Sequence, residues 1–203
     1  MRAVVSFGLV LTALLVVSGC GDSDDRSSQG GGGTTTVGDT TTTVETNGID
    51  PLEGAGTDAV VGKATGVETA LLERVALGRH EGFDRVVFQF KNHVPGYLIQ
   101  YVEPPIKEDG SGNIVRIKGN AFVVVRMEPA SGFDLTKNEG ELVYKGPRRI
   151  DGSAAGTSVV QELVRAGDFE AVLNWAVGLS DRVDFRVQKA SSPARLIVDF
   201  RNH

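Results

Sequence analysis

Apolar and polar residues alternate with a period of two over most of the chain beyond residue 69. The pattern is plainest at residues 85–90, where Val86, Phe88 and Phe90 fall on one face of an extended chain and their neighbours on the other. Gly, Pro and Asp separate such segments from one another. Alternation of this kind, interrupted by turn residues, is typical of an all-β domain. The sequence therefore predicts an all-β fold.

The alternation predicts ten segments, of which nine read as strands. On the first strand, we expect Leu71, Val75 and Leu77 to share a face. The pattern at 159–165 fits either a strand or a helical turn by itself. Residues 166–168 have the composition of a hairpin turn, and the clean alternation that follows them favours a β-hairpin here. Residues 128–157 are the least readable part. The segments comprise residues 69–79, 85–91, 97–103, 114–118, 121–127, 142–144, 159–165, 169–179, 183–188 and 195–200.

Two of the expected strands resemble each other. RVVFQF at residues 85–90 and RLIVDF at residues 195–200 share an arginine, two aliphatic residues, an apolar residue, a polar residue and a phenylalanine. The match is either chance or the mark of two related sheet edges. The second interpretation suits a β-sandwich.

The first nineteen residues have the three parts of an export signal. One arginine precedes an uncharged, mostly apolar run from residue 3 to residue 19. Its end, Val17-Ser18-Gly19-Cys20, resembles the lipobox of bacterial lipoproteins, which implies cleavage between Gly19 and Cys20 and a lipid on Cys20. The alternative is a chance cysteine after an ordinary secretory signal. We expect a lipid anchor on the extracytoplasmic face of the cell membrane, since two acyl chains hold a protein stably there.

Residues 20–63 have the composition of a disordered tether. They are rich in Gly, Thr, Ser and Asp and contain no aromatic residue, so they cannot bury enough apolar surface to fold. This segment holds eight acidic residues against two basic ones, whereas residues 64–203 hold eighteen of each. The expected domain, residues 64–203, is therefore close to neutral, and no nucleic acid is expected as a partner. The lone cysteine excludes an internal disulfide.

Several stretches of the domain resemble the AMIN and AMIN-like domains of bacterial envelope proteins, and most closely those of actinobacterial lipoproteins. They are GRHEGFDRVVF at 78–88, GDFE at 167–170, WAVGL at 175–179, FRV at 185–187 and SPARLIVDF at 192–200. The resemblance covers nearly all of residues 68–203. It implies a β-sandwich without an active site that binds peptidoglycan or an envelope protein.

Few residues suggest a binding or catalytic role. Tyr97 and Tyr101 alternate with an apolar residue and are candidate platforms for a sugar ring, whereas Arg148 and Arg149 are candidates for contact with an anionic wall polymer. An ordinary solvated pair is the alternative for the two arginines. Trp175 is either a stacking platform for a sugar ring or a core residue, and its alternation with apolar neighbours favours the core position.

No spacing of histidines, cysteines or carboxylates indicates a catalytic centre, a metal site or a cofactor. Asp84 and Asp199 are expected to cap turns or to form surface pairs. We therefore expect a protein that is not an enzyme and binds cell-wall glycan or a wall-associated protein. The alternative is a carrier or sensor that encloses a small apolar ligand between its sheets.

Overall fold

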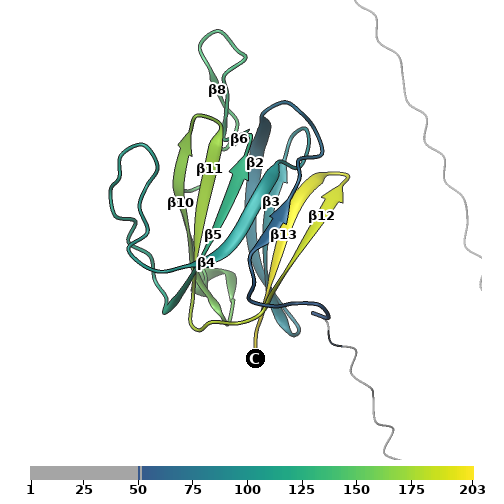
Figure 1. Ribbon diagram of the computed structural model, residues 1–203, viewed down its shortest axis with the longest axis vertical. Helices are drawn as coiled ribbons and strands as arrows, with labels where there is room; N and C mark the ends of the chain where they lie inside the picture. The colour runs from purple at the N-terminus through teal and green to yellow at the C-terminus, as the bar shows by residue number, and fades with distance from the viewer. Residues whose placement is uncertain (1–49, 51) are drawn as a thin grey trace, which may run out of the picture. The chain divides into compact units, whose positions relative to one another are not determined.

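The computed structural model describes residue 50 and residues 52–203. The predicted signal peptide, Cys20 and the tether up to residue 49 lie outside the described residues. Two sheets pack face to face, which confirms the predicted all-β, sandwich-like fold (Figure 1). In the described part of the chain, no helix is long and apolar enough to cross a membrane.

The strands of each sheet come from distant parts of the chain. Neighbouring strands are antiparallel except for β2 and β6. The six-stranded sheet runs β1 (Val60–Gly62), β4 (Gly96–Val102), β5 (Ala121–Glu128), β11 (Val172–Leu179), β10 (Val160–Phe169) and β9 (Arg149–Asp151). The five-stranded sheet runs β12 (Phe185–Ser191), β13 (Ala194–Arg201), β3 (Phe83–Phe90), β2 (Ala70–His80) and β6 (Ala130–Ser131). A separate hairpin joins β7 (Phe133–Asp134) and β8 (Glu141–Leu142), and a short 3-10 helix, Ser153–Ala155, follows β9.

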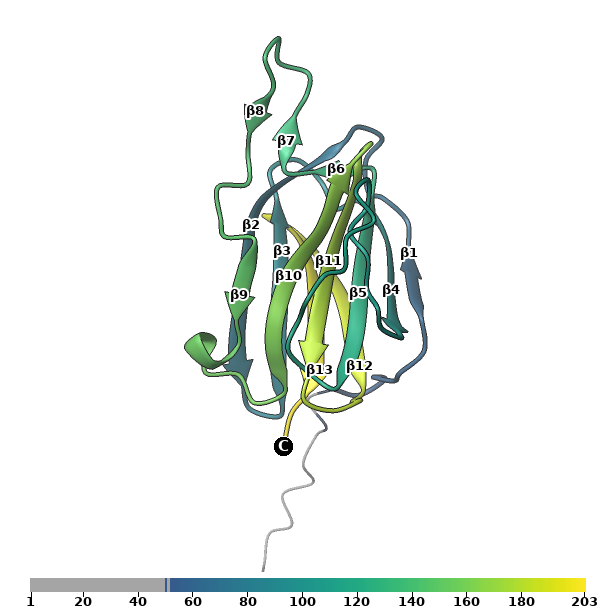
Figure 2. The ribbon, with the colours of Figure 1, turned by 90° about the vertical axis from the view of Figure 1, so that its left-hand side faces the viewer.

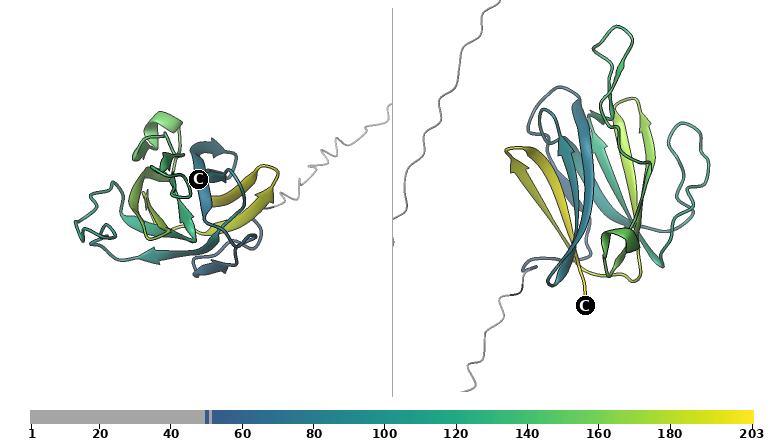
Figure 3. Two further views of the ribbon diagram at one scale, coloured as in Figure 1. Left: turned by 90° about the horizontal axis from the view of Figure 1, so that it is seen from above. Right: turned by 180° about the vertical axis from the view of Figure 1, so that it is seen from behind.

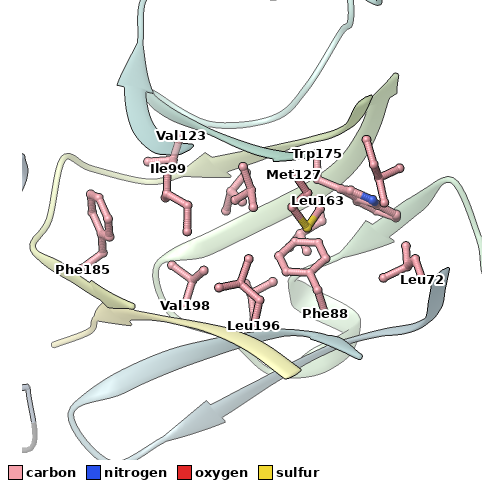
Figure 4. Packing of buried hydrophobic residues seen from close by; sticks show 14 of the residues in the cluster. Leu72, Phe88, Ile99, Val123, Met127, Leu163, Trp175, Phe185, Leu196 and Val198 are labelled. Atoms are coloured by element: carbon pink, nitrogen blue, oxygen red, sulfur yellow. The ribbon is translucent and has the colours of Figure 1, made fainter. Parts of the chain in front are cut away.

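Side chains from both sheets fill the space between them (Figure 4). Trp175 of β11 is fully buried, as its alternation predicted, and its ring meets that of Phe88 edge to face with 6.0 Å between centroids. Tyr144 packs against the same indole at 5.7 Å. Such aromatic pairs stabilise a core beyond the area that they bury.

A β-bulge changes which residues of β2 face the core. The register with β3 slips between Leu72 and Arg74, so Leu72 is fully buried while Val75 and Leu77 still pack against the core. The prediction that Leu71 shares their face is wrong. One extra residue in a strand moves every side chain before it to the opposite face.

Residues 159–165 belong largely to strand β10, which pairs with β11 and confirms the favoured β-hairpin. This strand continues through the expected turn at 166–168 as far as Phe169, with a bulge between Arg165 and Gly167. The chain turns instead at Glu170 and Ala171, whose φ angles are 50° and 59°. Two residues with positive φ suit the right-handed twist of a hairpin, and the predicted turn is therefore wrong by a few residues.

The two similar segments, 85–90 and 195–200, lie in β3 and β13. These strands are direct neighbours inside the five-stranded sheet, with Val87 opposite Ile197. The interpretation as two sheet edges is wrong. Both strands need the same alternation because both present one face to the core and the other outward.

Residues 103–120, here called the flap, cover the outer face of the six-stranded sheet (Figure 3). Ile106, Val115 and Ile117 of the flap pack against Val164 and Ala176 of the sheet. The flap contains no strand at 114–118, contrary to prediction, and only one isolated bridge joins its two limbs. No described segment covers the outer face of the five-stranded sheet (Figures 1 and 3).

The ordered domain begins before residue 64, so the predicted end of the tether at residue 63 is wrong. Leu52 is fully buried, Gly56 bridges to Phe185, and β1 pairs with β4. Asp50 accepts two hydrogen bonds from the Arg201 guanidinium at 3.0 and 2.9 Å. The described chain therefore starts beside its own C-terminus, and the β7–β8 hairpin projects from the opposite end of the sandwich (Figure 2).

Candidate functional site

The two tyrosines predicted as platforms lie on β4 and are engaged in packing. The Tyr101 hydroxyl donates to the carbonyl of Val183 at 2.6 Å and accepts from its N–H at 3.0 Å. The Arg182 guanidinium lies 4.1 Å from the centre of the Tyr101 ring. Burial raises the pKa of Tyr101 above its ordinary value. The ring of Tyr97 lies where a side chain at Gly62 would stand. These contacts make both rings poor stacking platforms.

Arg148 and Arg149 hold the flap against the six-stranded sheet. Arg148 pairs with Glu108 of the flap at 2.8 Å, and Arg149 donates to the flap carbonyl of Arg116. Arg149 also pairs with Glu162 of β10 at 2.9 Å. The two arginines therefore attach the flap to the sheet. The structure does not bring them near the two tyrosines.

A different set of arginines converges on the uncovered outer face of the five-stranded sheet. Cross-strand pairing arranges this face in four rows, because paired residues point to the same side. The first row contains Arg74, Gln89 and Arg195; the second Ala76, Val87, Ile197 and Gln188; the third Gly78, Arg85, Asp199 and Arg186; and the fourth His80, Phe83 and Arg201. Glu73 accepts a hydrogen bond from Gln89 in the first row, and Asp50 pairs with Arg201 in the fourth. We call Arg74, Arg85, Arg186 and Arg195 the arginine face.

Asp199 fixes two of these arginines. It is fully buried, and it accepts hydrogen bonds from Arg85 Nε at 2.7 Å, Arg85 Nη2 at 2.9 Å and Arg186 Nη2 at 3.3 Å. The hydrogen bonds to Asp199 raise the pKa of Arg85. Two guanidinium groups share one carboxylate, so one positive charge is left uncompensated, and Arg186 Nε is buried without a hydrogen-bond partner. The predicted role of Asp199 in a turn or an exposed pair is wrong.

Between the arginines, the face carries short side chains and is partly apolar. A side chain at Gly78, opposite Arg85, would meet no atom within 4 Å, so this part of the surface is open. Val87 and Ile197 lie side by side in the second row. The first and third rows are four residues apart along the strands, or about 13 Å. A flat surface of this kind fits an extended polymer that carries carboxylates, since arginine binds carboxylates through two parallel hydrogen bonds.

Asp84 is also buried, contrary to prediction, and its role is structural. Its Oδ2 accepts from the backbone N–H groups of Ser158, Val159 and Val160 at 2.9, 2.6 and 3.0 Å, and its Oδ1 accepts from Asn202 at 2.9 Å. It thus ties β3 of one sheet to the start of β10 in the other. No group of three or more potential metal ligands occurs among the residues that the structure describes.

Sequence reasoning missed the arginine face because its members are distant in the chain. Each arginine does stand at an outward position of an alternating strand, and that is the available signal. Only the strand order β12-β13-β3-β2 brings the four together.

The described part of the chain is a β-sandwich with one sheet face covered by the flap and the opposite, arginine-bearing face bare. The AMIN-like domain family matches residues 70–202, most of the chain, and the chain belongs to this family. Comparisons with curated proteins and with solved structures gave no match.

Proposed function

We propose that this chain is a non-catalytic, lipid-anchored protein of the bacterial cell envelope that binds peptidoglycan through its arginine face. The observation that carries the proposal is the uncovered sheet face on which Asp199 holds Arg85 and Arg186 in place. Membership of the AMIN-like family is consistent with a role at the cell wall.

The chemistry of the face matches that polymer. Peptidoglycan combines sugar rings, which have apolar faces, with peptide carboxylates. The second row offers Val87 and Ile197 to the former, and the flanking arginines suit the latter. Because Arg85 and Arg186 are already held by Asp199, they lose little side-chain freedom on binding.

The anchor is proposed from the sequence around Cys20. Changing Cys20→Ala should release the protein from the membrane fraction, because no diacylglycerol can then be attached. If the variant stays membrane-bound after a carbonate wash, another part of the chain is the anchor.

The structure favours a wall-binding protein over a carrier of a small apolar ligand. Such a carrier needs space between its sheets, and that space is occupied by Phe88, Trp175 and the side chains around them. The other partner that the proposal allows is a protein associated with the cell wall. Crosslinking to a protein in cells, together with no retention on purified peptidoglycan, would identify a protein as the partner.

A pull-down on purified peptidoglycan tests the arginine face. The probe is residues 20–203 with Cys20→Ser, here called the unlipidated chain. In the test variant, Arg74→Gln and Arg195→Gln remove two charges; neither residue forms an ion pair with another described residue, so the fold should persist. We expect about tenfold weaker binding, equivalent to about 1.4 kcal/mol.

The matched control carries Lys63→Gln and Lys107→Gln, which change the net charge equally at exposed positions outside the face. It should bind like the parent chain. Equal retention of the test variant and the control would contradict the proposed face, and no retention of the parent above a denatured sample would contradict binding to the wall.

A further inference from the structure

A second candidate site lies at the end of the sandwich from which the β7–β8 hairpin projects (Figure 2). It is a groove of about 920 Å³ between this hairpin and the chain that enters β2. The groove is separate from the arginine face, and none of the four arginines lines it.

Several apolar side chains on the walls of the groove are exposed to solvent. Val67 is 97% exposed, Leu135 79% and Phe133 41%, and Leu71 lines the groove with them. Clustered exposed apolar residues with polar neighbours are typical of binding surfaces rather than of an ordinary solvated surface.

The floor of the groove is held rigidly. The Asn92 side chain accepts from the N–H of Leu71 and donates to the carbonyl of Thr69, both at 2.9 Å. On the hairpin side, the Ser131 hydroxyl donates to Asp168 at 2.8 Å and accepts from the N–H of Phe133 at 3.0 Å. A site built on fixed backbone needs little reorganisation to bind.

The groove also carries charges of both signs. Asp134 accepts from the Thr136 hydroxyl at 2.6 Å and from its N–H at 3.0 Å. These bonds lower the pKa of Asp134, and the positive charges of Lys137 and Lys91 lower it further. Neither Lys91 nor Asp134 forms an ion pair with another residue in the described part of the chain. Lys91 is exposed, whereas Asp134 is only 7% exposed and both of its hydrogen bonds from Thr136 end on Oδ1. The groove is therefore lined by an ammonium group and by a carboxylate whose Oδ2 has no hydrogen-bond donor among the described residues.

We propose that this groove binds a short peptide bearing both a free amino group and a free carboxylate. Asp134 faces the amino group, Lys91 the carboxylate, and Leu71 and Phe133 the apolar part between them. For the source of the peptide the inference rests on the proposed function: the stem peptides of peptidoglycan are short and carry both groups.

Charge complementarity selects this ligand over simpler ones. A purely apolar ligand would cover Lys91 and Asp134 without partners, which is unfavourable. A simple anion would satisfy Lys91 but would be repelled by Asp134 and by Glu68, which also lines the groove. A neutral sugar would leave both charges unmatched.

The test is an NMR titration of the unlipidated chain with the tripeptide Ala-γGlu-Lys. A second titration uses the same tripeptide with its amino groups acetylated and its carboxylates amidated. We expect the free peptide to shift the signals of groove residues, and the blocked peptide to bind at least tenfold more weakly. No shifts in the groove, or equal binding of the two peptides, would overturn the proposal.

Two variants locate the binding. Lys91→Met and Asp134→Asn should each weaken the free peptide at least fivefold, whereas the control Lys107→Met should not. Lys91 is exposed and contributes only its backbone N–H to Leu71, so Lys91→Met retains the fold even if Asp134→Asn disturbs the hairpin. Unchanged binding by Lys91→Met would overturn the assignment.

The outcome is separable from the test of the arginine face. Groove shifts with the free peptide, together with full wall retention of the Arg74→Gln, Arg195→Gln variant, would contradict the arginine face and support the groove. Loss of wall retention in that variant without any peptide-induced shift would do the reverse.

Discussion

Replacing Asp84 should lower the free energy of unfolding of the domain strongly, because its one carboxylate accepts four hydrogen bonds. In Asp84→Ala, the backbone N–H groups of Ser158, Val159 and Val160 lose their shared acceptor, and Asn202 loses one as well. All of this occurs at a fully buried position. The two sheets also lose a direct polar connection between β3 and β10.

The magnitude follows from these hydrogen bonds. A hydrogen bond to a charged group contributes about 1.5–3 kcal/mol, and each orphaned buried donor costs about 1–3 kcal/mol. Simple addition overestimates the loss, because the desolvation of the carboxylate disappears and water enters the space. We expect about 3–5 kcal/mol for Asp84→Ala, a large part of the stability of a typical domain. Asp84→Asn keeps one acceptor oxygen and should cost about 1–2 kcal/mol.

Urea unfolding of the unlipidated chain, followed by the fluorescence of buried Trp175, measures these differences. The control Asp58→Ala removes an exposed carboxylate and should change the free energy of unfolding by less than about 0.5 kcal/mol. A loss below about 1 kcal/mol for Asp84→Ala would refute the reasoning, since it would mean that the three N–H groups find other partners at no cost.

Two further predictions concern the ends of the domain and the flap. Asp50→Asn should lower stability at pH 7: hydrogen bonds from Arg201 and Leu52 hold the pKa of Asp50 below its ordinary 3.8, so its contribution is present above that pH and disappears as the pH falls through the folded-state pKa. Thermal melts of both proteins from pH 7 to pH 2 should converge at the acid end, and a constant difference would contradict this ion-pair role. Gly178→Ala should loosen the flap, because the new methyl group collides with the backbone carbonyl of Lys118. Hydrogen exchange should increase across residues 103–120, and unchanged protection there would show that the flap does not depend on this close approach.

Much of the fold could be predicted from alternation alone. Strands β3, β5, β11, β12 and β13 follow it closely, and so does the burial of Trp175. The alternation does not show where a bulge occurs. One bulge in β2 places Leu72 in the core instead of Leu71. The strands β7, β8 and β9 have two or three residues each, too few to show any period.

The candidate site was less accessible to prediction. The apolar residues at 114–117 suggested a strand, but they pack as an irregular segment over a sheet face, and the periodicity is the same in both cases. Arg186 and Arg85 meet only because β13 lies between their strands, and sequence separation gives no sign of that order. Exposed and buried carboxylates also look alike in a sequence, so the sequence predicts surface positions for Asp84 and Asp199, which the structure shows to be buried.

The attachment of residues 50–69 gives the domain a specific response to mechanical force. A pull transmitted through the preceding chain acts first on the Asp50–Arg201 pair, then on the Gly56 bridge and the three-residue strand β1. Buried Leu52 and the hydrogen bonds between Thr65 and Val94 attach the same segment. Once these contacts have separated, residues 52–66 would extend by about 50 Å at roughly 3.4 Å per residue. This extra length would let the attachment point move away while the five-stranded sheet, with its arginine face, stays folded.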